Sequence, residues 1–187
     1  VSIFAFASVR AISQYTVDEI LEMGLDGFWI GYEGTRSGFA KQSGRPVPEI
    51  FREFRENGVS ILASREVVNE LRVIRDNALR KRVLDRLRRA NVEMIPVRPR
   101  VREIANELLR RGGWSQTDLV DMLHVGYAIV GEADVLVTWD TADLAREKTR
   151  RVVASLGRDW KFKAPDLATP LEVLTEWLGI KTPSSRT

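Results

Sequence analysis

Short apolar runs typical of buried strands alternate with helix patterns along most of the chain, and this alternation constrains the fold more than any other feature. The strand-like runs are Val1–Ser8, Phe28–Tyr32, Val59–Ala63, Val92–Val97 and Val135–Thr138. Strands that are separated by helices pair in parallel, because each helix carries the chain back across the sheet. The sequence therefore predicts an α/β fold with a mostly parallel sheet that is covered by helices on both faces.

Residues that cap helices mark where several of these helices begin. Ser64 directly follows the third strand-like run, and Ser115 opens a helix that we expect to continue to Val130. Thr169 and Glu172 have the spacing of a capping box, in which each side chain accepts a hydrogen bond from the backbone of the other. These signals predict helices that begin next to residues 64, 115 and 169.

The scarcity of cysteine and histidine limits the kinds of metal site and cross-link that the chain can form. The 187 residues include no cysteine and one histidine, so disulfides, thiolate zinc sites, iron–sulfur clusters and multi-histidine metal centres are excluded. A catalytic metal would have to bind to carboxylates. No run approaches the ~20 apolar residues of a membrane span, and the first residues lack the pattern of a signal peptide. We therefore expect a cytoplasmic protein that does not act at a membrane.

The basic residues are concentrated in one segment. The whole chain has a net charge of +3, whereas Arg72–Arg111 holds 13 basic residues against 5 acidic ones. Six of the basic residues crowd one predicted helix and its end: Arg80, Lys81, Arg82, Arg86, Arg88 and Arg89. Because arginine pairs well with phosphate groups, the segment is either an RNA-binding surface or an ordinary solvated face of a helix.

Three acids lie where the reactive groups of a parallel α/β sheet gather, at the carboxyl ends of strands and on the helices nearby. Asp140 follows one strand-like run, Glu70 lies in the helix after another, and Asp121 lies in the helix that Ser115 opens. Converging carboxylates bind Mg²⁺ or Mn²⁺, which can activate water for the hydrolysis of a phosphodiester. Each acid also has a structural interpretation, in which Asp140 caps a helix and the other two are charges on helix surfaces.

Three motifs lie between Ser64 and about Leu174. They are Ser64-Arg-Glu-Val-Val-Asn-Glu70-Leu, Asp121-Met-Leu-His-Val-Gly-Tyr-Ala128 and Gly131-Glu-Ala-Asp-Val-Leu-Val-Thr-Trp-Asp140-Thr-Ala-Asp-Leu144. This stretch resembles the PIN-domain ribonucleases, which include the toxins of prokaryotic toxin–antitoxin operons. The resemblance implies a three-layer Rossmann-like fold and RNA cleavage that depends on Mg²⁺ or Mn²⁺.

In that family four acids carry the reaction, and the resemblance assigns three of them here, namely Glu70, Asp121 and Asp140. Asp143 and Thr138 resemble the supporting polar positions, so Asp143 joins the three as a candidate metal ligand. The resemblance to the toxins also implies an antitoxin protein as a partner, and a homodimer is a second assembly to test.

The fourth acid is missing from its expected position. Family members carry an aspartate at the end of the first strand, and the tract Phe4-Ala-Phe-Ala-Ser-Val9 places Phe6 there. A phenylalanine side chain cannot bind a cation. Glu33 follows the second strand-like run and would replace the lost carboxylate if its strand lies beside that of Asp140, so Glu33 is a further candidate metal ligand.

Residues 1–64 resemble a different family. The tracts Ile20–Thr35, Ser43–Pro46 and Ile50–Ala63 are similar to the later barrel units of cobalamin-binding radical S-adenosylmethionine enzymes. In that family the glutamate matching Glu33 lies near the bound S-adenosylmethionine, although without cysteines the chain cannot inherit radical chemistry. The resemblances together predict a β-α-β-α-β segment of half-barrel type over residues 1–64 that completes the sheet, a PIN-like domain over 65–180 and a tail over 181–187.

Two further features each have two interpretations. His124 lies one turn after Asp121, where it would assist catalysis or contact substrate, or where it is simply a buried histidine packed near the sheet. The stretch Gly34–Gly44 is rich in glycine and basic residues, so it would cradle a phosphate through backbone N–H groups or form an ordinary surface loop.

The residues and the resemblance together favour a PIN-like endoribonuclease that hydrolyses RNA with Mg²⁺ or Mn²⁺ and is impaired by the missing first acid. One alternative is a non-catalytic module on the same fold that binds RNA or protein. The other is a barrel fragment that still binds S-adenosylmethionine near Glu33.

Overall fold

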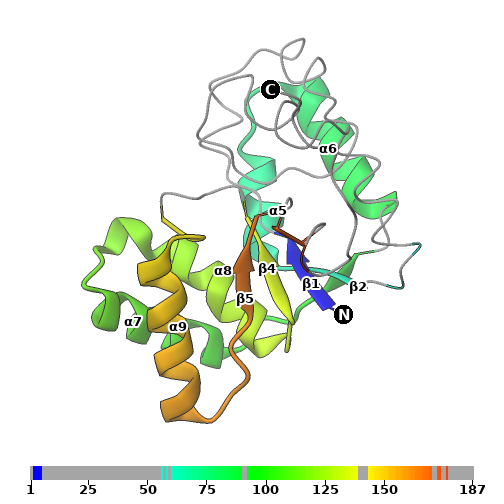
Figure 1. Cartoon of the computed structure of the whole chain (residues 1–187). Helices are drawn as coiled ribbons and strands as arrows, with labels where there is room; N and C mark the ends of the chain where they lie inside the picture. Colours follow the sequence, from blue (N-terminus) through cyan, green and yellow to red (C-terminus); the bar gives the residue numbers. More distant parts are fainter. Residues whose placement is uncertain are drawn as a thin grey trace, which may run out of the picture.

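The computed structural model describes residues 2–5, 56, 58, 60–89, 92–138, 143–169, 172–173 and 176 (Figure 1). Several sequence predictions lie outside these residues: the strand Phe28–Tyr32, the loop Gly34–Gly44, the side chains of Phe6, Glu33 and Asp140, and the tail over 181–187.

Within the described residues, five parallel strands form one open sheet in the order β3-β2-β1-β4-β5. The strands are β1 (Ser2–Ala5), β2 (Ser60–Ala63), β3 (Glu93–Met94), β4 (Val135–Val137) and β5 (Asp166–Ala168). The central strand β1 pairs with β2 on one side and with β4 on the other, so that Ala5 lies opposite Val137. The sheet confirms the α/β class with parallel strands, and it does not close into a barrel.

Five helices connect and cover these strands in the described part of the chain. They are α5 (Arg65–Arg72), α6 (Asn77–Arg89), α7 (Pro99–Gly112), α8 (Leu119–Val130), which a 3₁₀ turn at Gln116–Asp118 precedes, and α9 (Glu147–Trp160). Helix α7 packs against α8 and α9, and Figure 1 shows these three together, with α6 apart from them. None of the described helices is long and apolar enough to cross a membrane.

The predicted capping hydrogen bonds at Ser64 and Thr169 are formed, and a glycine ends one of the helices. Ser64 accepts a hydrogen bond from the backbone N–H of Val67 at 3.3 Å, which satisfies one free donor in the first turn of α5. The Thr169–Glu172 capping box is formed, since the N–H of Thr169 donates to Glu172 and the N–H of Glu172 donates to Thr169. Gly113 ends α7 in the left-handed conformation, with φ of 62°.

The hydrophobic core lies between the sheet and helices α5, α7, α8 and α9. All three residues of β4 are buried, as expected for a central strand with helices on both faces. The fully buried side chains of Leu71, Ile104, Leu108 and Leu156 come from α5, α7 and α9. This packing fixes α5 and α8 relative to the carboxyl ends of the strands.

Gly126 allows α7 and α8 to pack closely. A Cβ atom built at Gly126 would lie 2.7 Å from the backbone carbonyl oxygen of Val101, which cannot rotate away. We therefore expect Gly126→Ala to destabilise the protein by roughly 1–3 kcal/mol, as overpacked substitutions do. Helix propensity alone predicts the opposite, a gain of about 1 kcal/mol. Chemical denaturation of the parent and of Gly126→Ala shows whether the free energy of unfolding falls or rises. A stabilised variant would show that α7 and α8 can move apart.

Candidate active site

The carboxyl ends of the strands meet at one edge of the sheet because the strands are parallel. Helix α5 starts there directly after β2, with Ser64 between them. At the end of β4, Thr138 is buried and its backbone N–H donates to the carbonyl of Ala168 at 2.9 Å. Strand β1 lies between these two strands, so its carboxyl end is at the centre of this edge.

Glu70 lies on the buried side of α5. Val67 and Leu71, three residues before it and one after it, are completely buried, and only 19% of the Glu70 side chain is exposed. The structural interpretation of Glu70 as a charge facing solvent is therefore wrong. The sequence contained a signal for this placement, since positions 67, 70, 71 and 74 share one face of a helix.

Glu70 and His124 meet in the interior between α5 and α8. Oε2 of Glu70 lies 3.3 Å from Nε2 of His124, whose side chain is completely buried. Burial raises the pKa of Glu70 to about 8, and the charge of Glu66 adds to this. Burial lowers the pKa of His124 to about 3. Near neutral pH the carboxyl group of Glu70 therefore keeps its proton and His124 is a neutral imidazole.

Asp121 lies one turn before His124 in the first turn of α8 and is partly buried. Residues three apart on a helix are neighbours on its surface. Glu70 therefore contacts α8 one turn after the position of Asp121. Two of the three acids assigned from the sequence come from elements that pack together at this point.

Of the other predicted ligands, the structure describes Asp143 alone. Asp143 is exposed and lies 3.6 Å from the guanidinium of Arg146, while Asp140 and Glu33 are outside the described residues. Among the described residues, no group of three histidine or acidic side chains is close enough to hold a metal ion. The three-carboxylate site therefore stays a prediction that depends on Asp140.

The surroundings of Glu70 suit a divalent cation. Oε2 of Glu70 is buried, and among the described residues its 3.3 Å contact with Nε2 of His124 does not meet the geometry of a hydrogen bond, so the loss of water around this carboxyl group is only partly offset. A nearby cation would offset it, and carboxylate oxygens are the ligands that Mg²⁺ and Mn²⁺ prefer. The donor set of Glu70 and Asp121 thus fits the hard cation that the sequence predicts.

A comparison with protein-family models identifies the family of the chain. The PIN domain model matches residues 39–148, which is more than half of the chain and includes Glu70, Asp121 and Asp140. The chain belongs to the PIN domain family. A search of curated proteins finds no significant match.

Membership in the PIN family agrees with the Rossmann-like parallel sheet and supports a nuclease-type function. It does not support the barrel fragment. The match begins at residue 39, inside the segment that resembled a radical S-adenosylmethionine enzyme, and β1 and β2 belong to the same open sheet as β4 and β5. The division of the chain at residue 64 stays a prediction.

The basic residues of α6 divide between two sides of the helix in this PIN domain. A cavity of about 340 Å³ is lined by Asn77, Arg80, Lys81, Leu84, Asp85 and Arg88. At 3.6 residues per turn, Arg82, Arg86 and Arg89 occupy positions roughly 140° away around the helix. The helix positions of the six residues therefore spread over two sides of α6, and RNA binding by these residues stays a prediction.

Two of the three basic residues beside this cavity already have partners. Arg80 donates to the carbonyl of Ile74 at 3.1 Å and to the side chain of Asn77. Arg88 is 3.0 Å from Asp85, but it is 77% exposed, so this ion pair is weak and can exchange for a phosphate. Lys81 is exposed. These positions can bind an anion, although the paired arginines would lose their present contacts.

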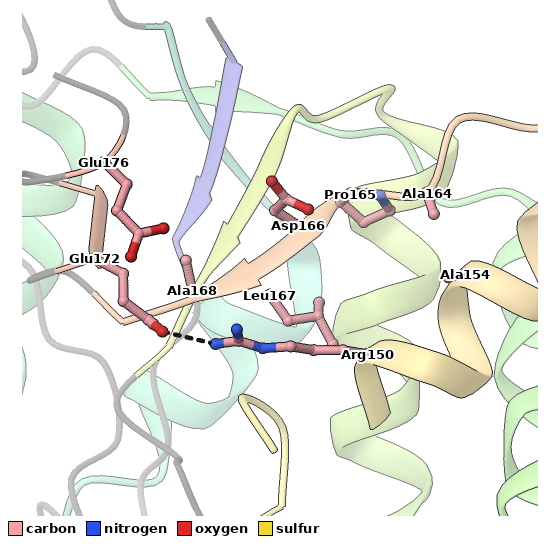
Figure 2. Close-up of a pocket in the computed structure, with 9 residues that line it drawn as sticks. All are labelled: Arg150, Ala154, Ala164, Pro165, Asp166, Leu167, Ala168, Glu172 and Glu176. Carbon is pink, nitrogen blue, oxygen red and sulfur yellow. Dashed lines mark hydrogen bonds and ion pairs between the residues drawn. The ribbon is translucent and has the colours of Figure 1, made fainter. Parts of the chain in front are cut away.

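A second cavity lies elsewhere, at the β5 end of the sheet. It has a volume of about 350 Å³ and is lined by Arg150, Ala154, Ala164, Pro165, Asp166, Leu167, Ala168, Glu172 and Glu176 (Figure 2). Arg150 and Glu172 form an ion pair at 2.9 Å across it. None of the candidate metal ligands that the structure describes lines this cavity. It was not predicted, because its lining residues come from α9, β5 and the segments on either side of β5.

The Glu70–His124 pair predicts how stability changes with pH. Folding raises the pKa of Glu70 above its ordinary 4.5 and lowers that of His124 below its ordinary 6.5. Stability is lost as pH rises from about 4.5 to 8 through Glu70, and it is lost as pH falls from about 6.5 to 3 through His124. Between pH 4.5 and 6.5 the two effects on stability cancel, because the folded and the unfolded protein bind the same number of protons at Glu70 and His124.

We therefore expect a plateau of stability from pH 4.5 to 6.5, with a fall of about 2 kcal/mol between pH 6.5 and 8 at about 1.4 kcal/mol per unit. Urea denaturation across this range measures it. Glu70→Gln, which cannot ionise, should remove the alkaline fall. If the stability of Glu70→Gln falls by the same amount between pH 6.5 and 8, another titrating group causes the loss.

Proposed function

We propose that this PIN domain is a metal-dependent endoribonuclease that hydrolyses phosphodiester bonds of RNA. The observation that carries the proposal is the buried carboxyl of Glu70 on α5, which lies 3.3 Å from His124 on α8, the helix that bears Asp121 one turn earlier. Both acids lie within the stretch that matches the family. The cytoplasmic location expected from the sequence is part of the same proposal.

The proposed metal ligands are Glu70, Asp121 and Asp140, with Asp143 and Glu33 as further candidates. A bound Mg²⁺ or Mn²⁺ lowers the pKa of its water and stabilises the charge that develops on the phosphate. The protein's part is to hold the carboxylates in fixed positions. The capped start of α5 and its buried face fix Glu70, and the packing of α8 against α7 fixes Asp121.

Phe6 weakens the proposed activity. It is the next residue in the sequence after β1, the strand at the centre of the sheet edge. A ligand missing at this position lowers the occupancy of the ion and misplaces it. We therefore expect weak cleavage of single-stranded RNA with Mn²⁺. If calorimetry detects no Mn²⁺ binding at millimolar concentration in the folded protein, the nuclease proposal fails.

Phe6 also favours a second candidate, a non-catalytic module that binds RNA through α6. In that case RNA binding would persist without metal and without cleavage. The same module would serve a protein partner such as an antitoxin. Size-exclusion chromatography of the purified chain tests the homodimer, and co-purification with the product of a neighbouring gene tests the antitoxin.

RNA binding by α6 has an expected dependence on salt. Each phosphate contacted on a single strand releases counterions and adds about −0.7 to the slope of log affinity against log salt. Replacing Arg86, Arg88 and Arg89 by Gln should make that slope less negative by roughly 2. Fluorescence anisotropy with a labelled RNA at several salt concentrations measures the slope.

The control for this variant changes the net charge by the same amount at a different surface. Arg102, Arg151 and Arg158 are exposed on α7 and α9, and their replacement by Gln should leave the slope almost unchanged. Equal effects of the two triple variants would show that α6 acts only through the total charge. No effect of either variant would identify the α6 cluster as an ordinary solvated face.

A further inference from the structure

His124 has no direct place in the proposed reaction. Its side chain is completely buried on α8, so it cannot contact RNA at the surface. Its Nε2 nevertheless faces a carboxyl oxygen of Glu70 at 3.3 Å, rather than only apolar groups. A polar side chain that is buried in this way needs an interaction that offsets the loss of water.

The position of His124 links the two acids of the site. It is three residues after Asp121 on α8, and its imidazole reaches across to α5, where it meets Oε2 of Glu70. A glutamate side chain has three rotatable bonds, and a partner on one oxygen restricts them. The other oxygen, Oε1, is then the one available to a ligand at the strand edge.

We propose that His124 is a positioning residue that holds Oε2 of Glu70 and thereby orients Oε1 toward the bound divalent ion. The inference rests on the proposed function, because it requires Glu70 to be a metal ligand. Partners of this kind, which contact a ligand rather than the metal, typically contribute 10- to 100-fold to metal affinity. The opposing interpretation is a histidine that only fills space in the core.

The chain offers a direct test, since His124 is its one histidine. In the ¹⁵N-labelled protein the imidazole nitrogens can therefore be assigned without ambiguity. Titration with Mg²⁺, which is diamagnetic, should shift the Nε2 resonance with the same saturation curve that calorimetry gives for ion binding. In Glu70→Gln this shift should be lost. A Nε2 resonance that does not move while Mg²⁺ binds would overturn the inference and leave the proposed function intact.

Mutation gives a second and independent measurement. His124→Leu, which keeps an apolar side chain of moderate size, should weaken Mn²⁺ binding by roughly 10- to 100-fold. His124→Gln, which retains a side-chain donor, should lose less affinity. The matched control is Val125→Ala, which truncates the next buried residue on α8 and should lower stability without changing Mn²⁺ affinity.

The outcomes separate the inference from the proposed function. Unchanged Mn²⁺ affinity in folded His124→Leu overturns the inference alone. The inference is also overturned if His124→Leu lowers Mn²⁺ affinity by the same factor in the parent and in the Glu70→Gln variant. A positioning residue must act through Glu70, so its effect should disappear when Glu70 is replaced. If the parent binds neither ion, both proposals fail. If His124→Leu does not fold, the resonance experiment on the unchanged chain still decides.

Discussion

Replacing Phe6 by aspartate is expected to raise Mn²⁺-dependent cleavage of single-stranded RNA by roughly 100-fold, from a weak or undetectable parental level. The reason is the position of β1. Ala5, the last residue of β1, lies opposite Val137 at the end of β4, so a carboxylate at residue 6 would follow the strand that is paired with the one leading to Asp140. The ion would gain a fourth acid at the centre of the edge.

The control for this substitution is Phe6→Asn, which has nearly the same size as aspartate but no charge. It should lose stability to the same extent as Phe6→Asp and gain no activity. The sequence places Phe6 in a buried strand, and by comparison with Phe→Ala we expect a loss of roughly 3–5 kcal/mol. Thermal unfolding must accompany the assay. Strong cleavage by the unchanged parent would show that the site is complete without residue 6, and Glu33 would then be the first substitute to examine.

The fold class could be predicted because the strands that build the centre of the sheet are short apolar runs. The predicted run Val59–Ala63 differs by one residue from β2, and Val135–Thr138 differs by one from β4. The helix expected from Ser115 to Val130 is a 3₁₀ turn followed by α8. In each case hydrophobic burial and a capping side chain point to the same boundary, so local sequence is sufficient.

The edges of the sheet were harder to predict because little of their stability is local. The run Val92–Val97 forms only a two-residue strand, β3, whose side chains are exposed. β5 is Asp-Leu-Ala, too short for any periodicity to show, and it exists because it pairs with β4. Helix α9 was also not identified. Its buried positions include the polar Thr149 beside Val153 and Leu156, so the apolar pattern is incomplete, and Arg146 in front of the helix provides no side-chain cap.

Only part of the candidate site could be predicted, because the rest depends on contacts between distant parts of the chain. The helix pattern and the resemblance selected Glu70 and Asp121, and the structure brings α5 and α8 together. Sequence alone left open whether Glu70 faces solvent and whether His124 has a partner, because both depend on the packing of two helices that are about 50 residues apart along the chain. The Glu70–His124 contact is a product of that packing.

Asp140→Asn in the Phe6→Asp protein is expected to lower Mn²⁺-dependent cleavage again by at least about 100-fold, because the substitution removes a charge from the ion while keeping the size of the side chain. Asp140 is two residues after Thr138, which continues from β4 at the carboxyl edge of the sheet. Calorimetry should show weaker Mn²⁺ binding in the same variant. Glu103→Gln is the matched control, since Glu103 is an exposed acid on α7 that pairs with Arg100 at the surface.

The result for Asp140 decides between the two interpretations of this residue. A metal ligand and a helix N-cap respond differently to asparagine, because asparagine caps a helix about as well as aspartate does. If Asp140 were only a cap, Asp140→Asn would leave stability, Mn²⁺ affinity and cleavage almost unchanged. Loss of Mn²⁺ affinity and cleavage with little change in the unfolding temperature is therefore the expected outcome for a ligand. Activity retained by a folded Asp140→Asn variant would remove this residue from the site, and the metal would then have to bind at Glu70 and Asp121 with a different third acid.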